Sequence, residues 1–171
     1  MTARPIAAVA VLVGGVALAC STAPSDARFV ATPPDETSFA PVALMLIQAC
    51  GTLDCHGTVG RNLRLYGNTG LRLRPGDVPT ALTATTNDEI EQDYMSVVGL
   101  EPEAMSAVVA SGGADPERLT LVRKARGTEA HKGGAPFLSP DDKEGVRDEC
   151  LTSWLSGKTD PSPCTRALMQ P

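Results

Sequence analysis

Two cysteines and a histidine stand close together in the segment Cys50-Gly-Thr-Leu-Asp-Cys55-His56. In covalent haem attachment, two cysteine thiols add to the vinyl groups of the porphyrin, and the histidine directly after the second cysteine ligates the iron. The usual motif has two residues between its cysteines, whereas this segment has four. The segment therefore predicts a c-type haem site with Cys50 and Cys55 as thioether positions and His56 as the proximal ligand.

The same side chains have two other interpretations. Cys50 and Cys55 can close a local disulfide, which leaves His56 as an ordinary surface histidine. They can also contribute to a zinc site, although Cys55 and His56 would then both have to reach one tetrahedral ion, and thiolates outside the cytoplasm tend to be oxidised first. The sequence leaves the haem, disulfide and zinc interpretations open.

The cysteine pair follows an expected helix. Pro41 suits a first helical position, apolar residues recur at helical spacing up to Cys50, and Gly51 ends the run. Capping signals and apolar periodicity predict further helices over about 87–98, from Pro102 to Gly112, from Pro116 to Gly127 and from Ser139 to Leu155.

One segment has the pattern of a hairpin. Residues 62–66 and 71–74 alternate apolar and polar side chains about Gly67-Asn-Thr-Gly70. The expected fold class is therefore mainly α, a small helical domain with a short β-hairpin insertion.

Several short motifs follow one another in a recognisable order. They are Cys50 to His56-Gly57, Asn62-Leu-Arg-Leu65, Pro75-Gly76, Pro116-Glu-Arg-Leu-Thr-Leu121, Ala130-His131-Lys132-Gly133-Gly134 and Leu151-Thr-Ser-Trp154-Leu155-Ser-Gly157. In this succession the stretch from about 46 to 157 resembles the small cytochrome c-like domains of exported proteins of myxobacteria and planctomycetes. The resemblance implies a cytochrome c-like helical domain that binds one haem c.

The resemblance also implies that the distal iron ligand lies in the loop around residue 131. Where that family often offers Met-Pro, this chain reads His131-Lys-Gly-Gly-Ala-Pro136, so His131 is the expected distal ligand. Met95 and Met105 are alternatives, although at helical spacing methionines are more often core residues. His131 can equally be a loop histidine that bonds backbone carbonyls and holds the Gly133-Gly134 turn.

The beginning of the chain has the anatomy of an export signal. Arg4 precedes an uncharged apolar run that is shorter than the roughly 20 residues needed to span a bilayer. The run ends in Ala17-Leu-Ala-Cys20, and small residues leading into a cysteine resemble the lipobox at which diacylglycerol is attached. Cys20 is therefore the expected lipidation site.

This signal divides the chain into three parts. We expect residues 1–19 to be a lipoprotein signal peptide, residues 20–37 a flexible tether rich in Pro, Ser and Thr, and residues 38–171 the cytochrome c-like domain. Export places the domain in an oxidising compartment. Cys150 and Cys164 are then expected to form a disulfide that ties the tail to the last helix.

The charge and the motifs of the chain argue against two classes of function, nucleic-acid binding and catalysis. With 15 Lys and Arg against 20 Asp and Glu, the net charge of −5 argues against nucleic acid as a partner. The chain contains no Ser-centred elbow, phosphate-binding loop or paired helical carboxylates, so it is not expected to be an enzyme.

The expected function is that of a lipid-anchored, periplasm-facing electron carrier with one covalent haem. Its partners would be the membrane, reached through the N-terminal lipid, and a redox protein; Ser21 after the lipidated cysteine favours the outer membrane. The alternative is a haem-free, disulfide-stabilised envelope lipoprotein that acts as a structural or protein-binding module.

Overall fold

The mainly helical fold class predicted from the sequence is confirmed. The computed structural model of the chain describes residues 29–74, 83–138, 145–158 and 160–170. Residues 31–171 form one compact unit, and residues 1–30 form another, of which only Phe29 and Val30 are described. The predicted signal peptide, the predicted lipidation site Cys20 and the first part of the predicted tether therefore lie outside the described residues.

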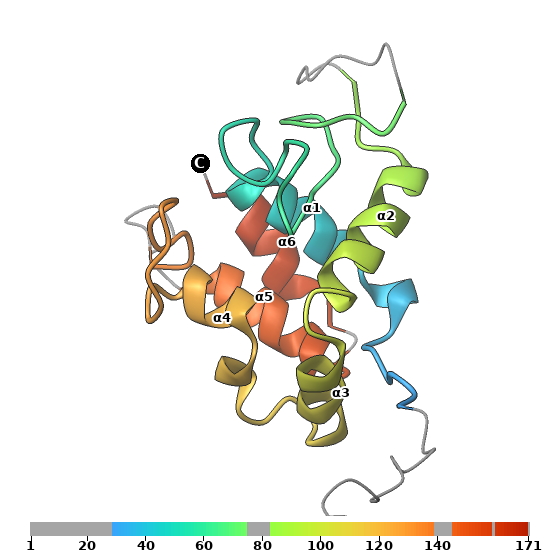
Figure 1. The fold of residues 1–171 in the computed structure, drawn as a ribbon, viewed down its shortest axis with the longest axis vertical. Helices are drawn as coiled ribbons and strands as arrows, with labels where there is room; N and C mark the ends of the chain where they lie inside the picture. The colour runs from blue at the N-terminus through green and yellow to red at the C-terminus, as the bar shows by residue number, and fades with distance from the viewer. Residues whose placement is uncertain (1–28, 75–82, 139–144, 159, 171) are drawn as a thin grey trace, which may run out of the picture. The chain divides into compact units, whose positions relative to one another are not determined.

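The helices of the described ranges are shown in Figure 1. They are α1 (Ala40–Cys50), α2 (Asn87–Val98), α3 (Pro102–Ala110), α4 (Thr120–Ala125), α5 (Val146–Leu155) and α6 (Ser162–Leu168), with 3-10 turns η1 (Glu36–Ser38) and η2 (Pro116–Arg118). Within these ranges, no helix has the length and apolar character needed to cross a membrane.

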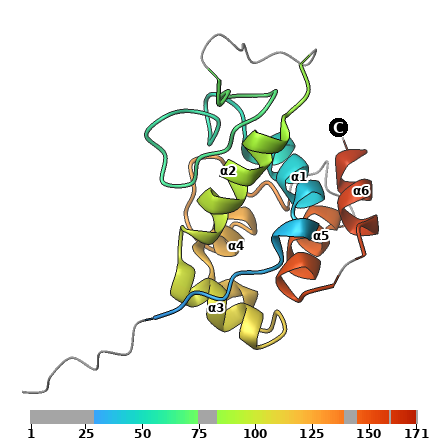
Figure 2. The ribbon, with the colours of Figure 1, turned by 90° about the vertical axis from the view of Figure 1, so that its right-hand side faces the viewer.

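Helix α1 is the central element because it packs against α2, α5 and α6 (Figures 1 and 2). Pro41 stands in its first turn, and the helix ends where the Gly51 N–H donates to the Ile47 carbonyl. Most of its side chains are apolar and buried, including Met45 and Leu46. The predicted helix that leads into the cysteine motif is therefore confirmed.

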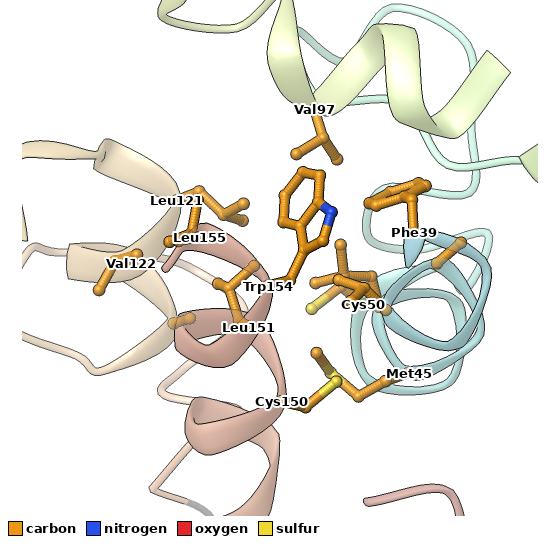
Figure 3. Packing of buried hydrophobic residues seen from close by; sticks show 14 of the residues in the cluster. Phe39, Met45, Cys50, Val97, Leu121, Val122, Cys150, Leu151, Trp154 and Leu155 are labelled. Atoms are coloured by element: carbon orange, nitrogen blue, oxygen red, sulfur yellow. The ribbon is translucent and has the colours of Figure 1, made fainter. Parts of the chain in front are cut away.

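Trp154 of α5 lies at the centre of the core (Figure 3). Its ring centroid is 4.9 Å from that of Phe39 and 6.3 Å from that of Tyr94 on α2. Its indole N–H donates to the Asp35 carbonyl at 2.9 Å. A buried indole needs such an acceptor, so the packing of Trp154 also fixes the chain just before α1.

The boundary of the tether differs from the prediction. Residues 31–37 belong to the compact unit, although the sequence placed them in a flexible tether. The Tyr94 hydroxyl donates to the Pro34 carbonyl at 2.9 Å, and the Thr32 N–H donates to Ser106 Oγ at 2.8 Å. Polar composition predicted a linker, but these backbone groups bond to the buried Tyr94 and the half-buried Ser106, which composition does not reveal.

The predicted hairpin does not form. Residues 62–74 make one isolated bridge, between Tyr66 and Leu71, and no strand. The Tyr66 N–H instead donates to Asp93 Oδ1 at 2.7 Å, and the Leu73 N–H donates to Glu89 Oε1 at 3.1 Å. Apolar and polar side chains do alternate in residues 62–66 and 71–74, but helix α2 supplies the hydrogen-bond acceptors that a paired strand would have supplied.

Two further helical predictions differ from the structure. The expected helix from Pro116 to Gly127 is divided at Leu119 into η2 and α4, because Leu119 adopts an extended backbone. Helix α6 was not predicted, and the start expected for the last long helix at Ser139 lies outside the described residues.

The predicted disulfide between Cys150 and Cys164 is present. Cys150 lies on α5 and Cys164 on α6, and these two helices pack against each other as well as against α1. The bond closes a loop with a sequence separation of 14 residues. It therefore restricts the unfolded chain and holds α6 on the core.

We expect the double variant Cys150→Ala, Cys164→Ala to lose about 3 kcal/mol of unfolding free energy, the chain-entropy value for a loop of this length. Urea unfolding of the full chain followed by circular dichroism measures this difference. Adding a reductant to the wild type should give a similar loss and leave the variant unchanged. Equal stability of variant and oxidised wild type would contradict the assignment.

Candidate functional site

The cysteine motif forms a tight loop at the end of α1. The His56 N–H donates to the Cys50 carbonyl at 3.0 Å, and the Cys55 N–H donates to the Thr52 carbonyl at 3.0 Å. The Arg61 side chain donates to the Cys55 carbonyl at 2.9 Å and closes the loop from outside. The four residues between the cysteines are thus accommodated in an ordered turn.

Glycines bring this loop against the next one. A Cβ atom added at Gly57 would lie 1.9 Å from the Gly51 carbonyl oxygen, and one added at Gly70 would lie 2.0 Å from the same oxygen. Backbone therefore meets backbone at Gly51, Gly57 and Gly70, an approach that only residues without a side chain allow. This contact fixes the cysteine motif relative to residues 67–70.

The His56 imidazole is half-buried and oriented by one backbone carbonyl. Its Nδ1 lies 2.9 Å from the Leu63 carbonyl oxygen. Because a carbonyl only accepts, Nδ1 carries the proton and Nε2 keeps its lone pair. Burial lowers the pKa of His56, the bond to Leu63 opposes that shift and the neighbouring His131 adds to it. The neutral, Nε2-basic imidazole is the form that binds a metal.

His131 lies in the loop after α4 and has the same arrangement. Its Nδ1 is 3.1 Å from the Gly134 carbonyl oxygen, which leaves Nε2 as the basic nitrogen. The ring lies over Gly133, where an added Cβ would be 2.9 Å from His131 Cε1. Buried Phe137 anchors the end of the loop by donating its N–H to the Ala125 carbonyl at 3.0 Å.

The structure brings the two histidines together. Their ring centroids are 5.8 Å apart and their planes differ by 21°. Two metal–imidazole bonds of about 2.0–2.1 Å each, with the radii of both rings added, correspond to a centroid separation of about 6 Å. The rings of His56 and His131 are stacked at a comparable separation, so one site contains both imidazoles.

Two cavities meet at this histidine pair. One, of about 300 Å³, has mainly apolar walls, and the other, of about 490 Å³, has mixed walls. Both are lined by His56, Lys124 and His131; Cys50 lines the first and Cys55 the second. Volumes of this size are typical of ligand and cofactor sites. The four residues predicted to hold haem therefore border adjoining cavities.

Both cysteines of the motif are free thiols. Burial raises the pKa of Cys50 to about 12, and the nearby Cys55 contributes to that shift. The Cys50 thiol therefore stays protonated at neutral pH, which slows its oxidation to a disulfide. The local disulfide considered from the sequence is not formed.

The donor set suits a porphyrin better than a bare metal ion. Within the described ranges, no three His, Cys, Asp or Glu side chains converge closely enough to hold a metal ion. A zinc site needs three or four protein ligands, so the zinc interpretation has no support there. A porphyrin supplies four nitrogen donors itself, so the imidazoles of His56 and His131 would be sufficient protein donors for its iron.

The remaining candidates from the sequence lie elsewhere. Met105 is a buried core residue of α3, and Met95 is 58 % exposed on α2; neither borders the apolar cavity. The alternative in which His131 bonds a backbone carbonyl of the Gly133-Gly134 turn is confirmed by its contact with the Gly134 carbonyl. Sequence reasoning missed the Leu63 carbonyl, because any residue supplies a carbonyl and no side-chain signal marks it. The glycine pair after His131 was the sequence signal for the turn that positions this ring.

Comparison of the chain with protein-family models, with curated proteins and with solved structures gave no match. The cytochrome c-like resemblance therefore depends on the succession of its motifs.

Gly133→Ala should displace the His131 ring, because the new Cβ would lie 2.9 Å from Cε1. We expect the nuclear Overhauser contact between the His56 and His131 rings to weaken in this variant of the full chain. Lys132→Ala, an exposed change in the same turn, should retain the contact. An undiminished contact in Gly133→Ala would show that Gly133 does not set the position of His131.

Proposed function

We propose that the chain is a lipid-anchored, c-type cytochrome-like electron carrier that faces the periplasm and binds one covalent haem. The observation that carries this proposal is the pair of imidazoles 5.8 Å apart, each with Nδ1 at a backbone carbonyl. Two free cysteines border the same pair of cavities. The protein would have a redox partner and no substrate in the enzymatic sense.

Four residues would hold the haem. Cys50 and Cys55 would form thioethers with it, and His56 and His131 would be the proximal and distal axial ligands. The bound iron supplies reversible one-electron transfer. Two histidines favour a lower potential than a His/Met pair, because methionine ligation raises the potential.

The surrounding residues have separate tasks. Leu63, Leu121 and Pro136 are among the apolar walls that would exclude water from the site. The Leu63 carbonyl keeps His56 in its Nδ1-protonated form, and the Gly134 carbonyl does the same for His131. Lys124 borders both cavities, and its ammonium lies 3.6 Å from Glu129 Oε1.

The location at the envelope is supported by the sequence of the first twenty residues alone. Cleavage before Cys20 and lipidation of its thiol would anchor the chain, and Ser21 favours the outer membrane. The residues after Cys20 up to about residue 30 would form the tether between lipid and domain. The net charge of −5 supports a protein rather than a nucleic acid as the redox partner.

The first experiment is an absorption spectrum of the full chain, produced with a c-type haem maturation system and then denatured. We expect the Soret band to stay with the unfolded wild-type chain, because thioethers survive unfolding. The double variant Cys50→Ala, Cys55→Ala should lose the band on denaturation.

His131→Met serves as the matched variant for the distal site. It should keep the covalent haem and raise the midpoint potential, as expected when methionine replaces an imidazole. A colourless wild type would refute the cytochrome proposal and favour the haem-free envelope module. An unchanged potential in His131→Met would refute His131 as the distal ligand.

Lipidation is tested by metabolic labelling with palmitate. We expect the wild-type chain to carry the label and to partition into detergent, because diacylglycerol is attached to the Cys20 thiol. Cys20→Ala should lose both properties, whereas Ser21→Ala should retain both. A label that persists in Cys20→Ala would place the lipid elsewhere.

A further inference from the structure

Helix α2 presents a row of acceptors to the segment that holds His56. Ser96, Asp93 and Glu89 are spaced three and four residues apart and therefore share one face of the helix. Ser96 Oγ accepts the Arg64 N–H at 2.9 Å, Asp93 Oδ1 accepts the Tyr66 N–H at 2.7 Å, and Glu89 Oε1 accepts the Leu73 N–H at 3.1 Å.

The other side of the same segment faces the cysteine motif. The Leu65 N–H donates to the His56 carbonyl at 2.9 Å, and the Leu63 carbonyl accepts from His56 Nδ1 at 2.9 Å. The side chains of Leu63 and Leu65 are buried, so this segment cannot shift without disturbing the core. A continuous path of hydrogen bonds and peptide units thus runs from α2 to the His56 ring.

Asp93 is the unusual member of the acceptor row. Its side chain is fully buried, and its Oδ2 has no hydrogen-bond partner. Burial raises the pKa of Asp93 to about 8; the bond from the Tyr66 N–H opposes this shift, and the charge of Glu89 adds to it. Glu89 differs, because hydrogen bonds from Arg72, Thr86 and Leu73 outweigh burial and lower its pKa.

The other charged and titratable groups on the elements that face Asp93 have interactions of their own. Arg72 pairs with Glu89 at 2.7 Å, and Arg64 donates to the Tyr66 hydroxyl at 3.3 Å. Asp35 and Glu36 near η1 act on Tyr94. The only titratable side chain of α1, which also packs on α2, is the Cys50 thiol. No cation is paired with Asp93 among the interactions described, so its neutral form is favoured at neutral pH.

We infer that Asp93 is a positioning residue for His56. Ionisation of the Asp93 carboxyl changes its hydrogen bond with the Tyr66 N–H, and the Leu63 carbonyl passes this change on to the orientation of the His56 imidazole. The inference concerns the same site as the proposed function. Its test requires no haem, so failure of one is distinguishable from failure of the other.

The test uses ¹⁵N resonances of the His56 ring in the full chain produced without haem, followed from pH 5 to 10. In the wild type we expect a transition near pH 8 in the Nδ1 resonance, in addition to any titration of His56 itself, whose pKa is lowered below 6.5. Asp93→Asn keeps the Oδ1 acceptor but cannot ionise, so the transition near pH 8 should vanish. Asp88→Asn, the same change at an exposed position of α2, should retain it.

Two other variants test the contact itself. In Asp93→Ala the Tyr66 N–H loses its acceptor, and we expect the Leu65 and Tyr66 amides to exchange about tenfold faster or more. Ser96→Ala should loosen the neighbouring Arg64 amide and leave the pH transition in place. If Asp93→Asn follows the wild-type pH curve, or if the wild type shows no transition near pH 8, the inference is wrong.

Stability provides an independent measurement. The folded chain holds the Asp93 proton up to about pH 8, whereas the carboxyl of the unfolded chain has its ordinary pKa of 3.8. The folded state thus binds more protons between these values, and stability falls as pH rises through that window. Asp93→Asn should flatten this decline in thermal unfolding, and Asp88→Asn should not. An equal decline in both variants would overturn the assignment.

Discussion

Backbone hydrogen bonding of the segment from Leu63 to Leu73 is the constraint on which the site depends. The segment lies between two helices and has no partner strand, yet buried N–H groups need acceptors. Helix α2 supplies them from its side chains, with Asp93 at the centre. Because the same segment bonds to His56 on its other side, the position of the imidazole follows from the docking of this segment on α2.

The two histidines are held in different ways. His56 is connected through Leu63 and the segment behind it to α2, and the glycine contacts at Gly51 and Gly70 fix the loop that carries it. His131 is held by a bond within its own turn, to the Gly134 carbonyl. The proximal side of the proposed site is therefore connected to α2 and to residues 67–70, whereas the distal side depends on one loop, whose end Phe137 anchors to α4.

The wall formed by α4 depends on packing with the C-terminal helices. Arg126, at the end of α4, donates to both carboxylate oxygens of Asp148 on α5, at 2.7 and 2.8 Å. Helix α5 in turn packs through Trp154 on the chain before α1, and the disulfide joins it to α6. Leu121 and Ala125, which line the apolar cavity, are held in place by these contacts between distant parts of the chain.

The sequence by itself determined the helices with strong local signals, the pairing of Cys150 with Cys164, and the identity of the candidate ligands. Capping by Thr86 and Glu89, the proline near the start of α1 and the glycine after it are local interactions, so their effect can be read from neighbouring residues. Only the tertiary structure decided that residues 62–74 bond to α2 instead of forming a hairpin. It also brought His56 and His131 to 5.8 Å and showed Asp93 to be buried with one oxygen unpaired. These features arise from contacts between residues far apart in the chain, and an alternating or polar pattern is the same whichever partner it meets.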